Sequence, residues 1–291
     1  EKSNIALRVE NFELCFILDY SVPVEDIVVF QRDFSVPVVV YDHHLREGLE
    51  ADNIYYNNPV AAGESGKDYP SCTWVLKSFM DIEVCDLVLL GIAGDMEERF
   101  ITDGFSRFPQ ISEYLQGSTQ RYMKYVKAKD LIDIHYKEND RTLFDDLPRM
   151  LVELDGDPDK ILKIEEWAIK DKRHKDEIDK ILQSPSVKSI ENILEIYEIK
   201  TRKNIISAIT RRFAAITDSR YVMVVNRSFL DDKAQIYIRC SDKCVEVNTS
   251  LFKSIAESIG AQAGGKHEVA GIIMKNSDVD RYIKLLEDRL K

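Results

Sequence analysis

The feature that most constrains this fold is the stretch 38–44, which reads Val-Val-Val-Tyr-Asp-His-His. Its β-branched run predicts a buried strand. Ligands in open α/β sheets bind beyond the carboxyl ends of the strands, so Asp42, His43 and His44 should project where chemistry takes place. A polar strand end of this kind contributes little to packing. It therefore favours a metal or phosphate site over a polar turn with a capping aspartate.

Two further apolar runs lead to a single carboxylate. We expect strands at 13–18, which precedes Asp19, and at 87–92, which runs through Gly91 and Gly94 to Asp95. Either one alone is weak evidence, because aspartate is common at the start of a helix that follows a strand. Together with 38–44 they predict one shared edge of the sheet. Carboxylate and imidazole ligands without a thiolate suit Mn²⁺ or Mg²⁺ better than structural zinc.

The chain order predicts an α/β fold in several parts. Strands at 27–30 and 38–41 and a helix at 72–79 indicate a mostly parallel sheet that lacks its first strand, because 13–18 already looks central. Helical periodicity covers 107–182, where His135 and His174 are expected at the surface. A long connecting helix is expected from Ser184-Pro185, with its apolar stripe at Ile190, Ile193, Leu194 and Tyr197. The predicted parts are an α/β domain, a helical insertion, the connecting helix and a smaller α/β domain, at 1–135, 136–183, 184–213 and 214–291.

A glycine-rich segment in the last part is the second candidate site. It contains Gly264, Gly265, Lys266 and His267 and precedes a predicted strand at 272–274. Consecutive glycines let backbone amides approach an anion closely. Arg239, at the end of a predicted strand at 235–238, would be its charged partner.

Two polar regions leave their interpretation open. The turn-rich loop 57–67 could hold a phosphate near the start of the next helix, or it could be a surface loop. The basic residues within 200–212 could face nucleic acid, although ordinary helix solubility is the simpler interpretation.

Composition sets broad limits on partners and location. The net charge of −11 argues against a protein that coats nucleic acid over its whole surface, but not against a local basic cleft. No apolar run reaches the roughly 18 residues of a membrane span. The five scattered cysteines predict a reducing, cytoplasmic location. The chain begins at Glu1 rather than Met, which is consistent with a fragment.

Four motifs in this order resemble the DHH phosphoesterase superfamily with its DHH-associated C-terminal domain. They are the strand-end Asp19, Asp-His-His at 42–44, Gly-Asp-Met at 94–96 and Gly-Gly-x-His at 264–267. The segment 91–96 looks most like the archaeal RecJ-like branch. That branch includes a nuclease associated with the GINS replication complex.

The resemblance implies a role for each motif residue. Asp19 would bridge two metal ions, Mn²⁺ or Mg²⁺, in the complete protein, and His43 and Asp95 would complete the shell of one. Asp42 would orient the site, and His44 would face the scissile phosphate. The phosphate backbone of the substrate would be held by Arg239, Gly264, Gly265, Lys266 and His267.

The chain departs from the family pattern in two places. The N-terminal Asp-x-Asp motif, which supplies metal ligands, is absent, so either an upstream segment is missing or the protein is a non-catalytic relative. In addition, Lys266 stands where the family has a third glycine.

The leading prediction is a metal-dependent exonuclease that acts on single-stranded nucleic acid in DNA replication or repair. Two alternatives stay open. One is a phosphodiesterase for oligonucleotides or other small substrates. The other is a non-catalytic replication scaffold that binds GINS or the replicative helicase.

Overall fold

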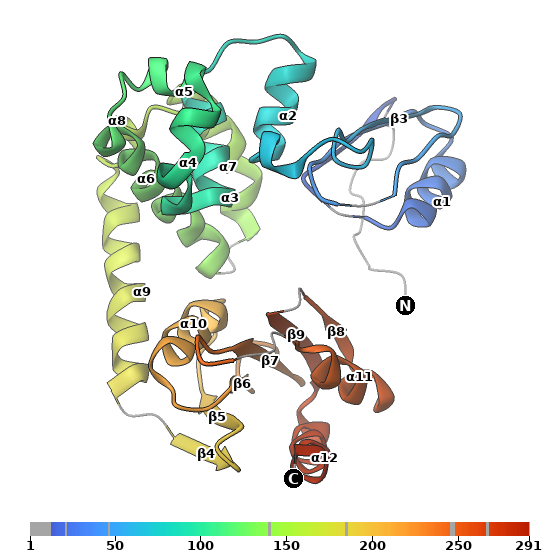
Figure 1. Ribbon diagram of the computed structural model, residues 1–291, viewed down its shortest axis with the longest axis vertical. Coiled ribbons are helices and arrows are strands. Elements are labelled where there is room, and N and C mark those ends of the chain that lie inside the picture. The colour runs from blue at the N-terminus through green and yellow to red at the C-terminus, as the bar shows by residue number, and fades with distance from the viewer. Residues whose placement is uncertain are drawn as a thin grey trace. The chain divides into compact units, whose positions relative to one another are not determined.

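The computed structural model describes residues 13–20, 22–45, 47–138, 141–183, 186–244, 248–265 and 268–290, with the backbone only at 141–145. The chain forms two compact units (Figure 1). The first comprises the described residues up to Leu131 together with Leu147–Ile164, and the second comprises Ile132–Asp146 and the residues from Glu165 onward. The four-part domain division remains a prediction, apart from the helix at 184–213, which is corrected below.

A parallel sheet organises the start of the first unit. Strands β1 (Cys15–Leu18), β2 (Val38–Tyr41) and β3 (Ile54–Asn57) pair in that order, and helix α1 (Val24–Phe34) connects the first two. The core of this part consists of Ile27, Val38, Val40 and Ile54. Because the strands are parallel, their carboxyl ends lie at one edge of the sheet.

Helices make up the rest of the first unit and part of the second. Their bounds are α2 (Cys72–Phe79), α3 (Asp86–Met96), α4 (Phe100–Arg107), α5 (Pro109–Tyr114), α6 (Thr119–Glu138), α7 (Arg141–Glu153) and α8 (Pro158–Ile161), with the short turns η1 (Gly66–Asp68) and η2 (Glu97–Arg99). The Ser71 hydroxyl caps α2 by accepting the Trp74 N–H. Asp86 ties the start of α3 to α5 and α6, because its carboxylate accepts the hydroxyls of Tyr114 and Tyr125, each at 2.6 Å.

The second unit is built on a mixed sheet that follows helix α9 (Glu165–Gln183). The strands lie in the order β4-β5-β6-β7-β9-β8. The strand bounds are β4 (Ser186–Ile190), β5 (Leu194–Ile199), β6 (Tyr221–Asn226), β7 (Lys233–Cys240), β8 (Gln262–Gly264) and β9 (Val269–Lys275), and the helix bounds are α10 (Ile206–Ile216), α11 (Ser250–Ser258) and α12 (Val279–Leu290), with a turn η3 (Asn276–Asp278). One face packs on α11 and α12, and the other packs on α10. Strand β6 is therefore buried on both faces.

Two predicted strands in the first unit are wrong, because both segments are helical. Residues 27–30 lie inside α1, and residues 87–92 lie inside α3. Helix α3 buries side chains around most of its circumference. A short helix of this kind has the same continuous apolar sequence as a buried strand.

The long helix predicted over 184–213 is also wrong. This segment contains strands β4 and β5, and only its end enters α10. The strands are joined by a tight turn in which Glu191 and Asn192 both have positive φ, and the Ile193 N–H donates to the Ile190 carbonyl. The apolar residues that were expected to line one face of this helix instead pack on the two faces of the sheet. Ser184-Pro185 lies outside the described residues.

His135 and His174 are buried, which corrects their predicted surface position. His174 Nε2 lies 3.0 Å from the Glu138 carboxylate, and the His135 ring packs edge-on against the Trp167 ring. Packing of α9 against the end of α6 encloses both imidazoles.

Two of the basic residues in 200–212 pair with acidic residues of α9. Lys203 Nζ lies 2.9 Å from Glu177, and Arg212 lies 2.7 Å from Asp179. These ion pairs favour the simpler interpretation of the basic residues. Among the described residues, each helix is too short or too polar to cross a membrane.

Candidate metal centre

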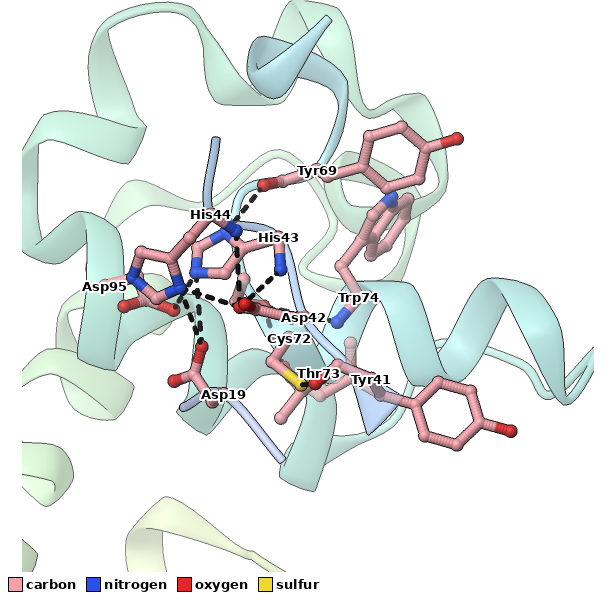
Figure 2. A network of polar contacts seen from close by, with 12 residues as sticks. Asp19, Tyr41, Asp42, His43, His44, Tyr69, Cys72, Thr73, Trp74 and Asp95 are labelled. Carbon is pink, nitrogen blue, oxygen red and sulfur yellow. Dashed lines mark hydrogen bonds and ion pairs between the residues drawn. The ribbon is translucent and has the colours of Figure 1, made fainter. Parts of the chain in front are cut away.

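The carboxyl edge of the parallel sheet carries the first residue of the site. Asp19 directly follows β1, and its backbone N–H donates to the Tyr41 carbonyl of β2 at 3.0 Å. Its φ of 53° lies in the left-handed region, which non-glycine residues rarely adopt. This turn of the backbone aims the carboxylate at His43 rather than along the strand (Figure 2).

Asp42 is the buried anchor of the Asp-His-His segment. Its side chain is 2% exposed. One oxygen accepts the backbone N–H groups of His43 and His44, at 2.8 and 3.2 Å, and lies 2.7 Å from His44 Nδ1. An ionised carboxylate only accepts hydrogen bonds, so Nδ1 of His44 carries the proton. Asp42 therefore sets the orientation of both histidines.

His43 points one ring nitrogen between two carboxylates. Nδ1 donates to the Tyr69 carbonyl at 3.0 Å, so Nε2 is the nitrogen that faces the site. Nε2 lies 3.3 Å from Asp19 and 3.7 Å from Asp95, yet it is buried without a well-aligned hydrogen bond among the described residues. A histidine that ligates a metal commonly has its second nitrogen bound to a carbonyl in this way.

Asp95 reaches the site from helix α3 instead of from a strand end. The close approach of α3 to α2 depends on Gly91, where an added Cβ would lie 2.2 Å from Thr73 Oγ1. That hydroxyl donates to the Val88 carbonyl at 3.0 Å, which fastens the two helices together. The first glycine of the Gly-Ile-Ala-Gly-Asp-Met segment is therefore required by the packing of α3 against α2.

The arrangement fits a divalent cation. Asp19, His43 and His44 each offer a ligand atom, and these atoms lie within 4.8 Å of one another. Burial by itself lowers the pKa of His43. The hydrogen bonds to Asp19 and to the Tyr69 carbonyl, with the charges of Asp95 and Asp19, have the larger combined effect and raise this pKa to about 9. A site that holds a proton this firmly attracts positive charge. The oxygen and imidazole donors are those that suit Mn²⁺.

Sequence reasoning missed three neighbours that support the site. The Tyr69 carbonyl orients His43, as described above. The buried amide of Asn58 donates to the His44 carbonyl at 2.9 Å and accepts the Ala61 N–H at 3.0 Å. Cys72 donates its thiol proton to the Tyr41 carbonyl at 3.2 Å. Asn58 lies in the loop 57–67, and the turn residues of that loop had indicated a possible functional role. Neither a backbone carbonyl nor a buried cysteine has any such signal.

The second candidate site lies in the second unit. Arg239 on β7 pairs with Val269 on β9, and Gly264 on β8 pairs with Gly271 on the same strand. Directly opposed residues of antiparallel strands point to the same face, so these positions share one face of the sheet. Gly265 has φ 121°, and an added Cβ would lie 2.3 Å from the Val269 carbonyl, so the hairpin itself requires this glycine. Among the described residues, no atom beyond its chain neighbours lies within 4 Å of a Cβ added at Gly264. Lys266 and His267 lie outside the described residues.

Solved structures show which known proteins share this fold, whereas the sequence matches no family model and no curated protein. A DHH-domain protein, titled as a member of the s1p family of ribosomal proteins, has a TM-score of 0.61 at 15% identity, over 95% of this chain and 69% of its own. RecJ from Thermus thermophilus in complex with Mn²⁺ has a TM-score of 0.62 at 14% identity, over 95% of this chain and 44% of RecJ.

Two further solved structures are similar to this chain. Exonuclease RecJ bound to manganese has a TM-score of 0.59 at 15% identity, over 95% of this chain and 75% of its own. PggH, a pGpG-specific phosphodiesterase from Vibrio cholerae, has a TM-score of 0.52 at 12% identity, over 95% of this chain and 97% of PggH. The chain therefore has the fold of the DHH phosphoesterases, as the motifs predicted. Its place in the archaeal RecJ-like branch remains a prediction.

Proposed function

We propose that this chain is the DHH part of a metal-dependent exonuclease that cleaves single-stranded nucleic acid from an end. The observation that supports this proposal best is the convergence of Asp19 and Asp95 on the buried Nε2 of His43. Carboxylates and an imidazole in this arrangement suit metal-assisted hydrolysis of phosphodiesters.

Each residue of the site has a role in the proposal. Asp19, His43 and Asp95 would hold Mn²⁺ or Mg²⁺, and a second ion would need further ligands. When bound, such ions supply a nucleophilic water and stabilise the charge that develops on the phosphate. Asp42 holds both imidazoles in place, and His44, whose side chain is 40% exposed, meets the scissile phosphate.

Substrate binding is assigned to the second unit. Arg239 would pair with the phosphate backbone, and the open position at Gly264 would let the substrate approach the main chain. Gly265, Lys266 and His267 complete the proposed segment. The wider setting in replication or repair, binding to GINS and the helicase, and a cytoplasmic location are also proposals.

Hydrolysis of end-labelled single-stranded DNA with Mn²⁺ tests the site in the complete protein. Asp95→Ala and Asp19→Asn should lower the rate by at least about 100-fold, because the first removes a proposed ligand and the second removes the negative charge of another. The control is Asp103→Asn, which removes an exposed carboxylate of α4 and should keep the wild-type rate. Wild-type activity in Asp95→Ala would rule out the assigned site.

A small-substrate phosphodiesterase is the second candidate, because PggH shares the fold over nearly its whole length. Rates on a dinucleotide and on a long single strand separate the two candidates. Preference for the dinucleotide would favour the small-substrate enzyme. A non-catalytic scaffold predicts no hydrolysis of either substrate together with retention of GINS in a binding assay.

A further inference from the structure

Cys72 lies directly beneath the ends of two strands of the site. It is the first residue of α2 and is 4% exposed. Its Sγ donates to the Tyr41 carbonyl at the end of β2, at 3.2 Å, as Figure 2 shows. The thiol therefore binds the main chain at the residue that directly precedes the Asp-His-His segment.

These contacts lie where the backbone has an unfavourable conformation. Asp19 has φ 53°, in the left-handed region that non-glycine residues rarely adopt. The Tyr41 carbonyl accepts both the Asp19 N–H and the Cys72 thiol, so the three groups form one junction. Such a conformation persists only where surrounding contacts hold it.

We propose that Cys72 is a positioning residue, whose thiol fastens the ends of β1 and β2 to helix α2 and thereby fixes the Asp19 carboxylate relative to His43. This inference rests on the proposed metal centre. Cys72 itself would contact neither metal nor substrate.

The chemical state of the thiol agrees with this role. Burial, followed by the charges of Asp19, Asp42 and Asp95, raises the pKa of Cys72 to about 12. The side chain therefore stays a neutral S–H donor near pH 7. A cysteine at the start of a helix often has a lowered pKa and reacts as a thiolate, and here burial, together with the carboxylates, prevents that.

Three variants separate positioning from packing. Cys72→Ala removes the donor, and Cys72→Ser keeps a donor and an acceptor. Cys15→Ala removes a thiol from β1 whose sulfur lies 3.9 Å from the carbonyl of its neighbour Phe16. Mn²⁺ affinity is measured by calorimetry, and exchange of the Asp19 amide is measured by NMR without metal.

We expect Cys72→Ala to weaken Mn²⁺ binding by about 10–100-fold, the range typical of residues that orient ligands. The Asp19 amide should also exchange faster. Cys72→Ser should restore most of both properties, and Cys15→Ala should leave both at the wild-type value. If Cys72→Ala does not fold, Cys72→Val, which fills the space without a donor, takes its place.

The outcomes distinguish this inference from the proposed function. Wild-type Mn²⁺ affinity and wild-type amide exchange in the donor-free variant would overturn the positioning role. If the wild-type protein binds no Mn²⁺, the proposed function fails, and the Asp19 exchange rate alone decides whether Cys72 holds the strand ends.

Discussion

Both histidines of this site are oriented by neighbouring groups that are not proposed metal ligands. Asp42 orients His44, the Tyr69 carbonyl orients His43, and Asn58 holds the main chain at His44. These supporting contacts leave His43 Nε2 facing Asp19 and Asp95. The charge of the metal-free site therefore depends on how His43 titrates.

We predict that His43 titrates near pH 9 in the metal-free protein, compared with 6.5 for a free imidazole. Because the pKa is raised on folding, this group stabilises the fold fully below pH 6.5, and the stabilisation is lost as the pH rises through 9. Mn²⁺ must displace the proton, so its apparent affinity should rise with pH up to about 9. NMR titration of the histidine rings measures the pKa.

Asp19→Asn should lower the pKa of His43, since it removes the neighbouring negative charge. His174 serves as the reference in the same spectra. Burial, together with the charge of Lys203, lowers the pKa of His174, and Asp19→Asn should leave the pKa of His174 unchanged. Titration of His43 near 6.5 in the wild-type protein would contradict the geometry of the site.

At the scale of elements, the contact between α2 and α3 determines whether Asp95 reaches the strand ends. Gly91→Ala should destabilise the protein by about 1–3 kcal/mol, because the new methyl group overlaps Thr73 in a packed interface. Urea unfolding measures this change. Metal affinity should fall as well, because α3 must shift to relieve the overlap.

Gly94→Ala is the matched control in the same helix. Among the described residues, no atom outside the surrounding helix backbone lies within 4 Å of the added Cβ, so the substitution should be neutral or should stabilise by about 0.5–1 kcal/mol. Equal destabilisation by the two substitutions would show that helix packing is not the reason for Gly91.

At the scale of the whole molecule, the proposed metal ligands all belong to the first of two compact units. Mn²⁺ at about 100 times its dissociation constant should stabilise the unit that binds it by about 2.7 kcal/mol. We expect slower hydrogen exchange in β1, β2 and α3, with no change in β6 and β7. Mass spectrometry of exchanged peptides measures both units in one sample. Equal protection of both units would contradict a site built from the first unit alone.

The sequence alone predicted the strand at 38–41 and the shared edge of a parallel sheet. The reason is local, since a β-branched run specifies a strand and parallel pairing brings strand ends together. Asp19, His43 and His44 could therefore be grouped before any coordinates were known. Their roles in metal binding remain a proposal.

Only the tertiary structure decided how Asp95 arrives and what supports the site. The runs 27–30 and 87–92 are helices, and the stripe from Ile190 to Tyr197 belongs to strands, because short apolar segments fit either structure until their neighbours are known. The contacts of Cys72, Asn58 and the Tyr69 carbonyl join residues far apart in the chain. Sequence determines local chemistry and periodicity, whereas the close approach of distant segments depends on packing that no local pattern records.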